Sequence, residues 1–173
     1  DNGSTDNNGG SENGTTTGNK LFDYTFSESI TLNNTTETSV SPYGSVSASG
    51  TVTTDATKGF KFGGKDTYLK ITLANNTTLQ VGDVITITSY AGKTGMGVKA
   101  SAEAGGNAIT VTSSKETNVN TTSSYTVKSD DVLNGKSCIY LYRSAGSTTY
   151  LKSITITRAV KKYKVSATAK EGG

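Results

Sequence analysis

Few residues of this chain could perform chemistry, because its 173 residues include no histidine and one cysteine, Cys138. Nucleophilic triads and histidine-rich zinc sites need histidine, so the sequence excludes both classes of site. The one adjacent acidic pair, Asp130 and Asp131, lies in KSDDVL and is interpreted as a turn or cap. Glycosidases use two carboxylates that face each other across a cleft. We therefore predict that the chain is not an enzyme, and that Cys138 is a buried small hydrophobe.

Scattered acidic residues leave a structural calcium ion as an open alternative. Calcium takes about six to eight oxygen ligands, often from carboxylates and backbone carbonyls in loops. None of these acidic residues falls in a spaced calcium-loop motif. The candidates are Asp23, Glu28, Asp66, Asp83 and Asp130. We predict no certain cofactor, and the sequence leaves structural calcium undecided.

Tyrosine is the side chain that points most clearly to a ligand, since the chain has nine tyrosines and no tryptophan. A tyrosine ring can stack on the apolar face of a sugar while its hydroxyl stays polar. In CIYLYRS, alternation places Tyr140 and Tyr142 opposite Ile139 and Leu141. Arg143 follows, and arginine can donate forked hydrogen bonds to vicinal hydroxyls or to a carboxylate. This strand end is one predicted part of a carbohydrate site.

The loop YAGKTGMG supplies the other part. Tyr90 opens this loop, and Lys93 lies within it. The predicted carbohydrate-binding residues are therefore Tyr90, Lys93, Tyr142 and Arg143. Replacing Tyr142 or Arg143 with alanine is expected to abolish binding without unfolding the domain.

A purely structural role competes with ligand binding at each tyrosine. Cross-strand pairs of tyrosine with threonine or lysine stabilise sheets by about 0.2–1 kcal/mol. Tyr68 and Tyr150 are each followed by Leu-Lys, and we interpret both as structural.

Short segments of alternating apolar and polar residues must position these side chains. They are rich in β-branched and aromatic residues, and Asn and Gly turn signals separate them. The predicted strands lie in LFDYTFS, SVSASGTVT, GFKF, TYLKITL, DVITITSY, GVKASAE, AITVTS, SSYTVKS, CIYLYRS and YLKSITITR. About ten short strands, with no sustained helical period, predict an all-β sandwich or jelly roll.

The composition divides the chain into three parts. Residues 1–20 contain no hydrophobic residue, which predicts a flexible linker or tail. Residues 21–158 form the predicted sandwich module. Residues 159–173 are predicted to be a linker or the start of a following module, with one more strand over Tyr163–Ala167. The end of the chain resembles the glycine-containing repeats that follow one another in bacterial surface proteins.

Charge and hydropathy restrict the partners. The net charge of +3 is too small and too scattered to indicate binding to nucleic acid or to an anionic membrane. No apolar run approaches the roughly 20 residues that a membrane span needs. We expect a monomer, covalently linked to neighbouring modules of a larger protein.

The segment from Tyr68 to Arg158 resembles a known class of module. Its motifs are YLKITL, LQVGDVITITSYAG and SYTVKSDDVLNGKSCIYLYRSAGSTTYLKSITITR. They are similar to non-catalytic β-sandwich modules of Bacteroidetes surface or secreted polysaccharide-degrading proteins, which often accompany pectate lyases. The pairing of VGDVITIT with YLKSITIT also resembles galactose-binding-like modules, whose closing strand returns through the middle of one sheet. The lack of tryptophan departs from many such modules and argues against a broad platform for crystalline polysaccharide.

Two functions follow from this resemblance. The first is a carbohydrate-binding module, extracellular or on the cell surface, in a bacterial outer-membrane lipoprotein or a secreted protein. Its ligand would be a soluble polysaccharide or oligosaccharide, held near the loops Tyr90–Gly97 and Tyr142–Tyr150. The second is a structural or adhesive spacer of a surface protein, with no sugar site.

Overall fold

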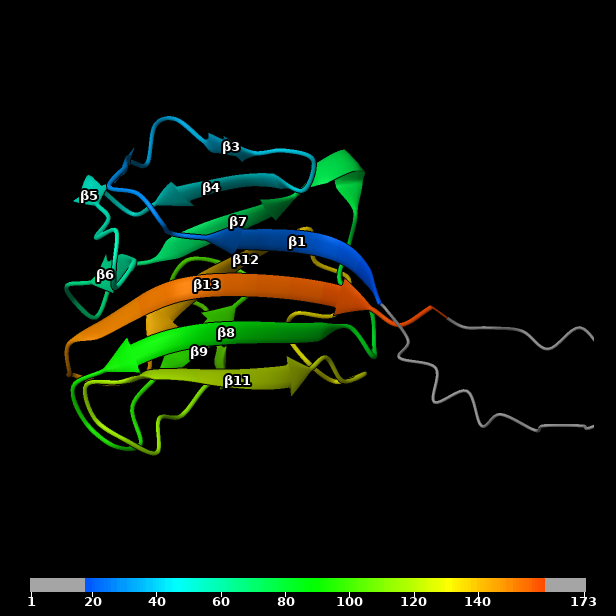
Figure 1. Cartoon of the computed structure of the whole chain (residues 1–173). Helices are drawn as coiled ribbons and strands as arrows, with labels where there is room; N and C mark the ends of the chain where they lie inside the picture. Colours follow the sequence, from blue (N-terminus) through cyan, green and yellow to red (C-terminus); the bar gives the residue numbers. More distant parts are fainter. Residues whose placement is uncertain (1–17, 161–173) are drawn as a thin grey trace, which may run out of the picture.

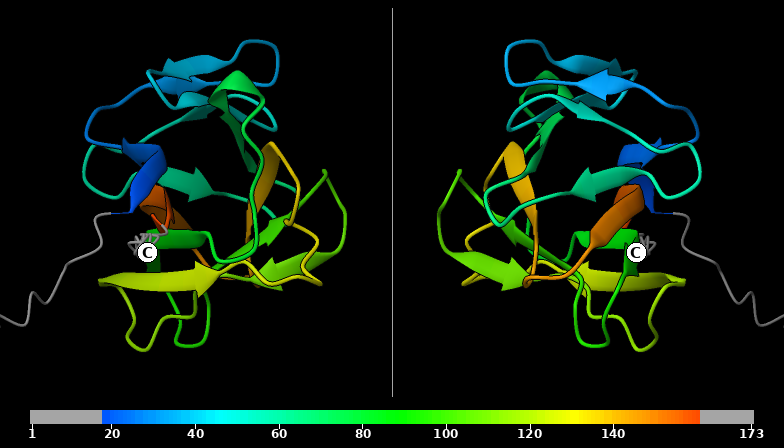
Figure 2. Two further views of the ribbon diagram at one scale, coloured as in Figure 1. Left: turned by 90° about the vertical axis from the view of Figure 1, so that its right-hand side faces the viewer. Right: turned by 90° about the vertical axis from the view of Figure 1, so that its left-hand side faces the viewer.

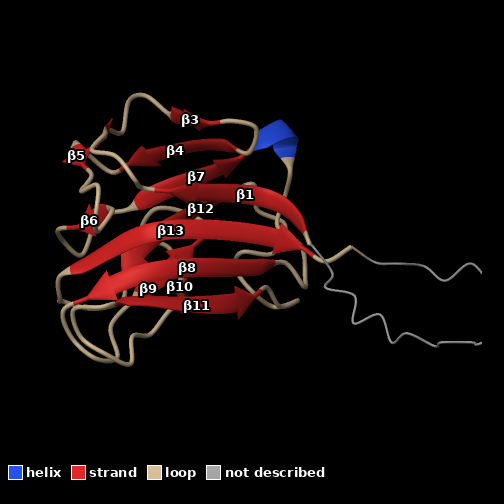
Figure 3. Cartoon of the chain, in the orientation of Figure 1, coloured by secondary structure: helices blue, strands red, loops and turns tan. Residues whose placement is uncertain are grey.

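Alternating apolar and polar residues form the strands of the structure, as the sequence predicts. The computed structural model describes residues 18–160 of the chain. Strand β7 (Leu69–Leu73) buries its first, third and fifth residues, and β8 (Val84–Ala91) buries every second residue from Ile85. Strands cover much of the described chain in Figure 3, and the all-β fold class is confirmed.

A five-stranded sheet forms one layer of the sandwich. Its strands are β1 (Asn19–Thr25), β13 (Thr149–Arg158), β8 and β11 (Asn120–Thr126), in that order, with β6 (Phe60–Phe62) pairing with β13 as well. Strand β13, the last of the described chain, lies between β1 and β8 (Figure 1). A last strand in the middle of a sheet is the arrangement that the resemblance to galactose-binding-like modules implies.

A six-stranded sheet forms the opposite layer. Its strands are β10 (Ala108–Thr110), β9 (Val98–Ser101), β12 (Cys138–Arg143), β7, β4 (Gly44–Ala48) and β3 (Thr38–Val40), in that order. The turned views of Figure 2 show β12 on one side of the molecule and β1 with β13 on the other. Buried side chains from both sheets fill the space between them.

The structure contains thirteen strands within residues 18–160, rather than about ten. The additional strands are very short. They include β3 and the two-stranded sheet of β2 (Thr31–Leu32) with β5 (Val52–Thr53). One predicted strand, SVSASGTVT, divides into β4 and β5. Two or three residues are too few to show a period of two, which explains why the pattern missed them.

A bulge keeps the apolar residues of β13 on the inner face. Leu151 and Ile154 are both fully buried although they lie three positions apart, which strict alternation forbids. The pairing of β13 with β8 shifts register between Leu151 and Ser153, and this irregularity restores the inward direction. The Lys152 ammonium group donates hydrogen bonds to the carbonyls of Phe26 and Ala56. Lys152 therefore ties loops to this sheet.

A buried ion pair joins the end of β13 to the start of β8. Asp83 is 1% exposed, and its two carboxylate oxygens accept hydrogen bonds from Nε and Nη2 of Arg158, at 2.9 and 2.8 Å. Arg158 Nη2 also donates to the Thr78 carbonyl at 2.8 Å. The Asp83 carboxylate raises the pKa of Arg158. Because both of its oxygens are used, Asp83 serves the framework rather than a free acidic site.

Near the two chain ends, the structure departs from one prediction and does not describe the residues of another. Strand β1 begins at Asn19, two residues inside the predicted linker, and pairs there with Arg158 of β13. The predicted strand Tyr163–Ala167 lies outside the described residues. The one helix between residues 18 and 160 is the short 3-10 turn η1 (Ala74–Asn76), so no helix there is long and apolar enough to cross a membrane.

Candidate functional site

Three tyrosines gather on the outer face of the six-stranded sheet. Tyr140 and Tyr142 project from β12 on the side away from Ile139 and Leu141, which are buried, so the predicted alternation is confirmed. The ring of Tyr68 packs edge-on against both, with centroids 5.1 Å from Tyr140 and 5.7 Å from Tyr142. The structure thus adds Tyr68, which the sequence treats as framework, to the tyrosines of the candidate site.

Tyr142 is covered on this outer face, with only 7% of its surface exposed. Its hydroxyl accepts a hydrogen bond from the backbone N–H of Gly105, at 3.0 Å. Burial raises the pKa of Tyr142 above the usual tyrosine value. The segment between β9 and β10 therefore holds Tyr142 in place, and alanine at this position would alter folding as well as any binding.

A pocket of about 240 Å³ opens beside Tyr142. We call it the Tyr142 pocket. It is lined by Lys65, Asp66, Lys99, Gly105, Gly106, Ala108 and Tyr142. Lys99 reaches the pocket because it is the cross-strand partner of Tyr142 in the pairing of β12 with β9. Sheet register, the segment before β10 and the β6–β7 connection, which carries Lys65 and Asp66, together create the hollow.

The charges of the Tyr142 pocket are available to a ligand. Neither Lys65 nor Lys99 forms a salt bridge with another residue of the described chain. Lys70, on the same outer face, differs because its ammonium group lies 3.5 Å from Glu37 Oε1. Hydrogen bonding from Ser45, followed by the charge of Lys70, lowers the pKa of Glu37. The pocket combines two lysines that form no salt bridge within residues 18–160, a carboxylate and an aromatic ring.

A second tyrosine pair lies on the outer face of the five-stranded sheet. Tyr90 of β8 and Tyr150 of β13 are cross-strand partners, and their ring centroids are 5.9 Å apart. The Lys58 ammonium group lies 5.1 Å from the Tyr90 centroid and 5.4 Å from that of Tyr150. A cation this close to a ring centroid is attracted by the ring's negative face. Lys58 therefore forms cation–π contacts with both rings of this pair.

The two loops that the sequence singles out do meet. The Gly97 N–H donates to Ser144 Oγ, and the Ser144 N–H donates to the Gly97 carbonyl, both at 2.8 Å. Gly92 donates to the Thr148 carbonyl, also at 2.8 Å. The segments after β8 and β12 are therefore joined by hydrogen bonds.

Their four predicted binding residues nevertheless point in different directions. Tyr90 and Tyr142 lie on the outer faces of different sheets, and Lys93 is exposed on its loop. Arg143 alternates with Tyr142, and its Nε is buried with no hydrogen-bond partner among residues 18–160. A sugar-binding role for each of these residues stays a prediction. Of the four, Tyr142 alone lines the Tyr142 pocket.

Sequence reasoning missed Lys65 and Lys99 as candidates. Lys65 lies in the turn-like run FGGK, and Lys99 alternates with buried Val98 and Ala100 in β9. The alternation places Lys99 on an outer face, which is a usable signal. Its position opposite Tyr142 depends on strand pairing, which the sequence does not state.

Asp131 and Cys138 both contact neighbouring residues of the framework. Asp131 accepts hydrogen bonds from the Tyr125 hydroxyl at 2.7 Å and from the Lys128 N–H at 2.6 Å, as a turn residue would. No group of three or more acidic, cysteine or histidine residues within the described range could hold a metal ion, and the calcium alternative stays untested. Cys138 is half-buried rather than buried, because it shares the outer face with Tyr140 and contacts Thr72.

No protein-family model matches this chain, and no curated protein matches it.

Proposed function

We propose that this chain is a carbohydrate-binding module that attaches a surface or secreted bacterial protein to an acidic polysaccharide through the Tyr142 pocket. The observation that carries the proposal is the pair Lys65 and Lys99, which flank a tyrosine-lined hollow and have no salt-bridge partner among residues 18–160. Two such cations favour a sugar that carries a carboxylate, as uronic acids do.

The other lining groups suit the rest of a sugar ring. The Asp66 carboxylate can accept hydrogen bonds from sugar hydroxyls, and Ala108 with the exposed 7% of Tyr142 offers apolar surface. The volume of about 240 Å³ lies below the range of about 300–1,000 Å³ typical of drug-sized ligands. The pocket therefore suits one sugar unit of a chain, and repeated units on one polymer would raise the effective concentration.

The β-sandwich architecture and the central position of β13 support the finer assignment to a galactose-binding-like module. A non-catalytic role, and a location outside the cell or on its surface, belong to the same proposal. The competing function is a structural spacer with no sugar site.

Affinity electrophoresis in gels that contain pectin, xylan, mannan or mucin glycans tests the proposal. We expect retardation in pectin, whose uronic acids carry carboxylates, and weaker or no retardation in the neutral mannan. The double variant Lys65→Ala/Lys99→Ala should lose this retardation, and Lys58→Ala, which removes a lysine over the outer face of the other sheet, should keep it. Migration unchanged in every polymer would contradict the proposal and favour the spacer.

A further inference from the structure

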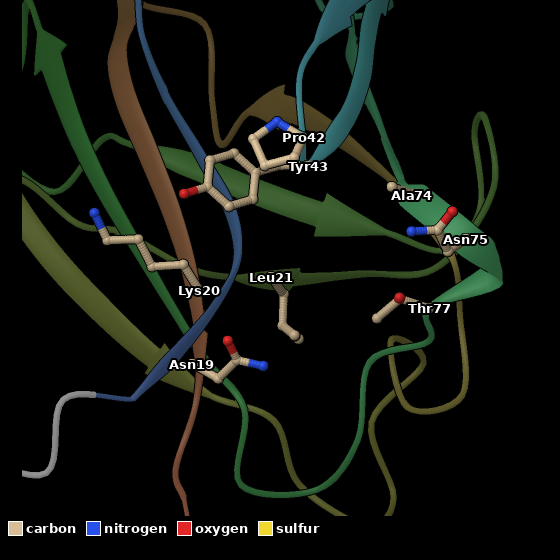
Figure 4. A pocket seen from close by; sticks show the side chains of 8 residues that line it. All are labelled: Asn19, Lys20, Leu21, Pro42, Tyr43, Ala74, Asn75 and Thr77. Carbon is tan, nitrogen blue, oxygen red and sulfur yellow. The ribbon is translucent and has the colours of Figure 1, made fainter.

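A larger hollow lies at the end of the molecule where β1 begins, and we call it the Tyr43 cleft (Figure 4). Its volume is about 390 Å³, within the range typical of ligand pockets. It is lined by Asn19, Lys20, Leu21, Pro42, Tyr43, Ala74, Asn75 and Thr77. Three separate parts of the chain thus contribute to it, namely β1, the β3–β4 turn and η1 with the residue after it.

Backbone hydrogen bonds hold two of these walls together. The Tyr43 N–H donates to the Val40 carbonyl at 2.7 Å, and the Tyr43 carbonyl accepts from the Ala74 N–H at 2.9 Å. The side chain of Tyr43 is half-buried against the core, which leaves part of its ring at the cleft. The wall that carries this ring is therefore attached directly to the wall formed by η1.

Neutral polar side chains form part of the lining of the Tyr43 cleft. The side chains of Asn19, Asn75 and Thr77 hydrogen-bond to no other residue of the described chain. In Figure 4, Asn75 and Thr77 lie to the right of Leu21, and Asn19 lies to its lower left. The Tyr43 ring lies above Leu21 in the same view. Amides both donate and accept hydrogen bonds, as sugar hydroxyls do. Leu21, with these amides and a hydroxyl around it, matches a molecule that has apolar ring faces and hydroxyl groups at its edges.

The single cation of this lining is paired. Lys20 Nζ lies 2.7 Å from Asp23 Oδ2, and this hydrogen bond raises the pKa of Lys20. The cleft contains no acidic residue. Its charge balance therefore differs from that of the Tyr142 pocket, where Lys65 and Lys99 are free of salt bridges with described residues.

The backbone fixes where the Asn75 amide lies. Asn75 has φ 56° and ψ 36°, in the left-handed region that asparagine and glycine adopt more readily than other residues. The next residue, Asn76, has φ 53° but does not line the cleft. The pair thus provides a test position and a neighbour of the same residue type with a similarly positive φ.

We propose that the Tyr43 cleft is a second binding site and takes a neutral saccharide. The Tyr43 ring and Leu21 would contact an apolar face of the sugar, while the Asn19 and Asn75 amides and the Thr77 hydroxyl would bond its hydroxyls. This site does not depend on the Tyr142 pocket, because the two share no residue and differ in charge.

Nuclear magnetic resonance of the ¹⁵N-labelled full chain tests this proposal with four probes, namely cellohexaose, mannohexaose, xylohexaose and galactotetraose. We expect at least one to cause saturable shifts of the Leu21, Tyr43 and Asn75 backbone amides. Titration to about 10 mM would nearly saturate a site with a dissociation constant of about 1 mM. The absence of saturable shifts at these three amides with all four probes would overturn the proposal.

The variant Asn75→Gly keeps the left-handed backbone and removes the amide group, so folding should be preserved. We expect it to weaken binding of the responding probe by about threefold to tenfold, the worth of one hydrogen bond. The matched control Asn76→Gly should bind as the unchanged protein does. Equal affinities of both variants and the unchanged protein would overturn the assignment.

The double variant Lys65→Ala/Lys99→Ala separates this site from the proposed function. It should leave the neutral probe's shifts at Leu21, Tyr43 and Asn75 intact. Loss of those shifts in the double variant would overturn the independence of the two sites. Failure of pectin retardation, by contrast, would leave a positive result at the Tyr43 cleft unchanged.

Discussion

The outer faces of the two sheets carry the same residue types in different arrangements. On the five-stranded sheet, the Lys58 ammonium group lies over the rings of both Tyr90 and Tyr150, and the lysine and the tyrosines form cation–π contacts with each other. On the six-stranded sheet, the segment between β9 and β10 covers Tyr142, and a pocket remains beside it with two lysines. Alternation thus decides which face a tyrosine takes, whereas the neighbouring segment decides whether a pocket remains beside its ring.

The largest expected difference between the faces is in folding stability. Tyr142→Ala should lower the free energy of unfolding by about 3 kcal/mol, because it empties a buried volume and removes a hydrogen-bond acceptor. Tyr90→Ala, at a half-buried cross-strand pair, should cost only about 1 kcal/mol. Urea denaturation monitored by circular dichroism measures both values. Equal losses would show that Tyr142 is not more firmly packed than Tyr90.

The next difference is in affinity for acidic sugars. Lys65→Ala/Lys99→Ala should weaken binding of trigalacturonate by about tenfold, the sum of two ion pairs with carboxylates near the surface. Raising the salt concentration should weaken binding by the unchanged protein too, because screening acts on exposed charges. Isothermal titration calorimetry gives the dissociation constants, with Lys58→Ala as the control from the other sheet. A larger effect from Lys58→Ala would move the site to the five-stranded sheet.

A smaller effect isolates the hydrogen bond that holds the covering segment. Tyr142→Phe keeps the ring but removes the acceptor for the Gly105 N–H, and should cost about 1 kcal/mol of stability. The Gly105 amide should also exchange its hydrogen faster. Tyr140→Phe is the matched control, because the Tyr140 hydroxyl bonds to no other residue within 18–160. Unchanged exchange at Gly105 in the Tyr142→Phe protein would contradict this role of Tyr142.

The smallest expected effect concerns Tyr90 and Tyr150, the two tyrosines that Lys58 contacts. Lys58→Ala should lower stability by about 0.5 kcal/mol, as expected for an exposed contact between a cation and two rings. Thermal unfolding at low salt measures the shift, and Lys115→Ala provides a control, because Lys115 is exposed and lies over no aromatic ring of residues 18–160. A Lys58→Ala protein no less stable than Lys115→Ala would show that Lys58 does not interact with the rings.

Much of the fold was predictable from local patterns. The period of two placed Tyr140 and Tyr142 opposite Ile139 and Leu141, and the structure confirms this. The bulge in β13 was not predictable, because strict alternation gives no reason for Leu151 and Ile154 to share a face. Very short strands such as β2 and β5 leave no pattern to detect.

The candidate site was predictable only in part. Tyr142 was found, but its partner Lys99 depends on the pairing of β12 with β9, and its cover depends on the conformation of a connecting segment. The expected grouping of Tyr90 with Tyr142 rested on loops that do meet. Strands whose following loops meet can still belong to different sheets, so their outward side chains face opposite sides of the sandwich, as Tyr90 and Tyr142 do.

The central claim is that an acidic sugar binds beside Tyr142, and mapping where trigalacturonate perturbs the ¹⁵N-labelled protein tests it most directly. We predict saturable shifts at the backbone amides of Lys99, Gly105, Gly106 and Ala108, with Tyr90 and Tyr150 unaffected. Shifts confined to Tyr90 and Tyr150, or no saturable shift anywhere, would contradict the account.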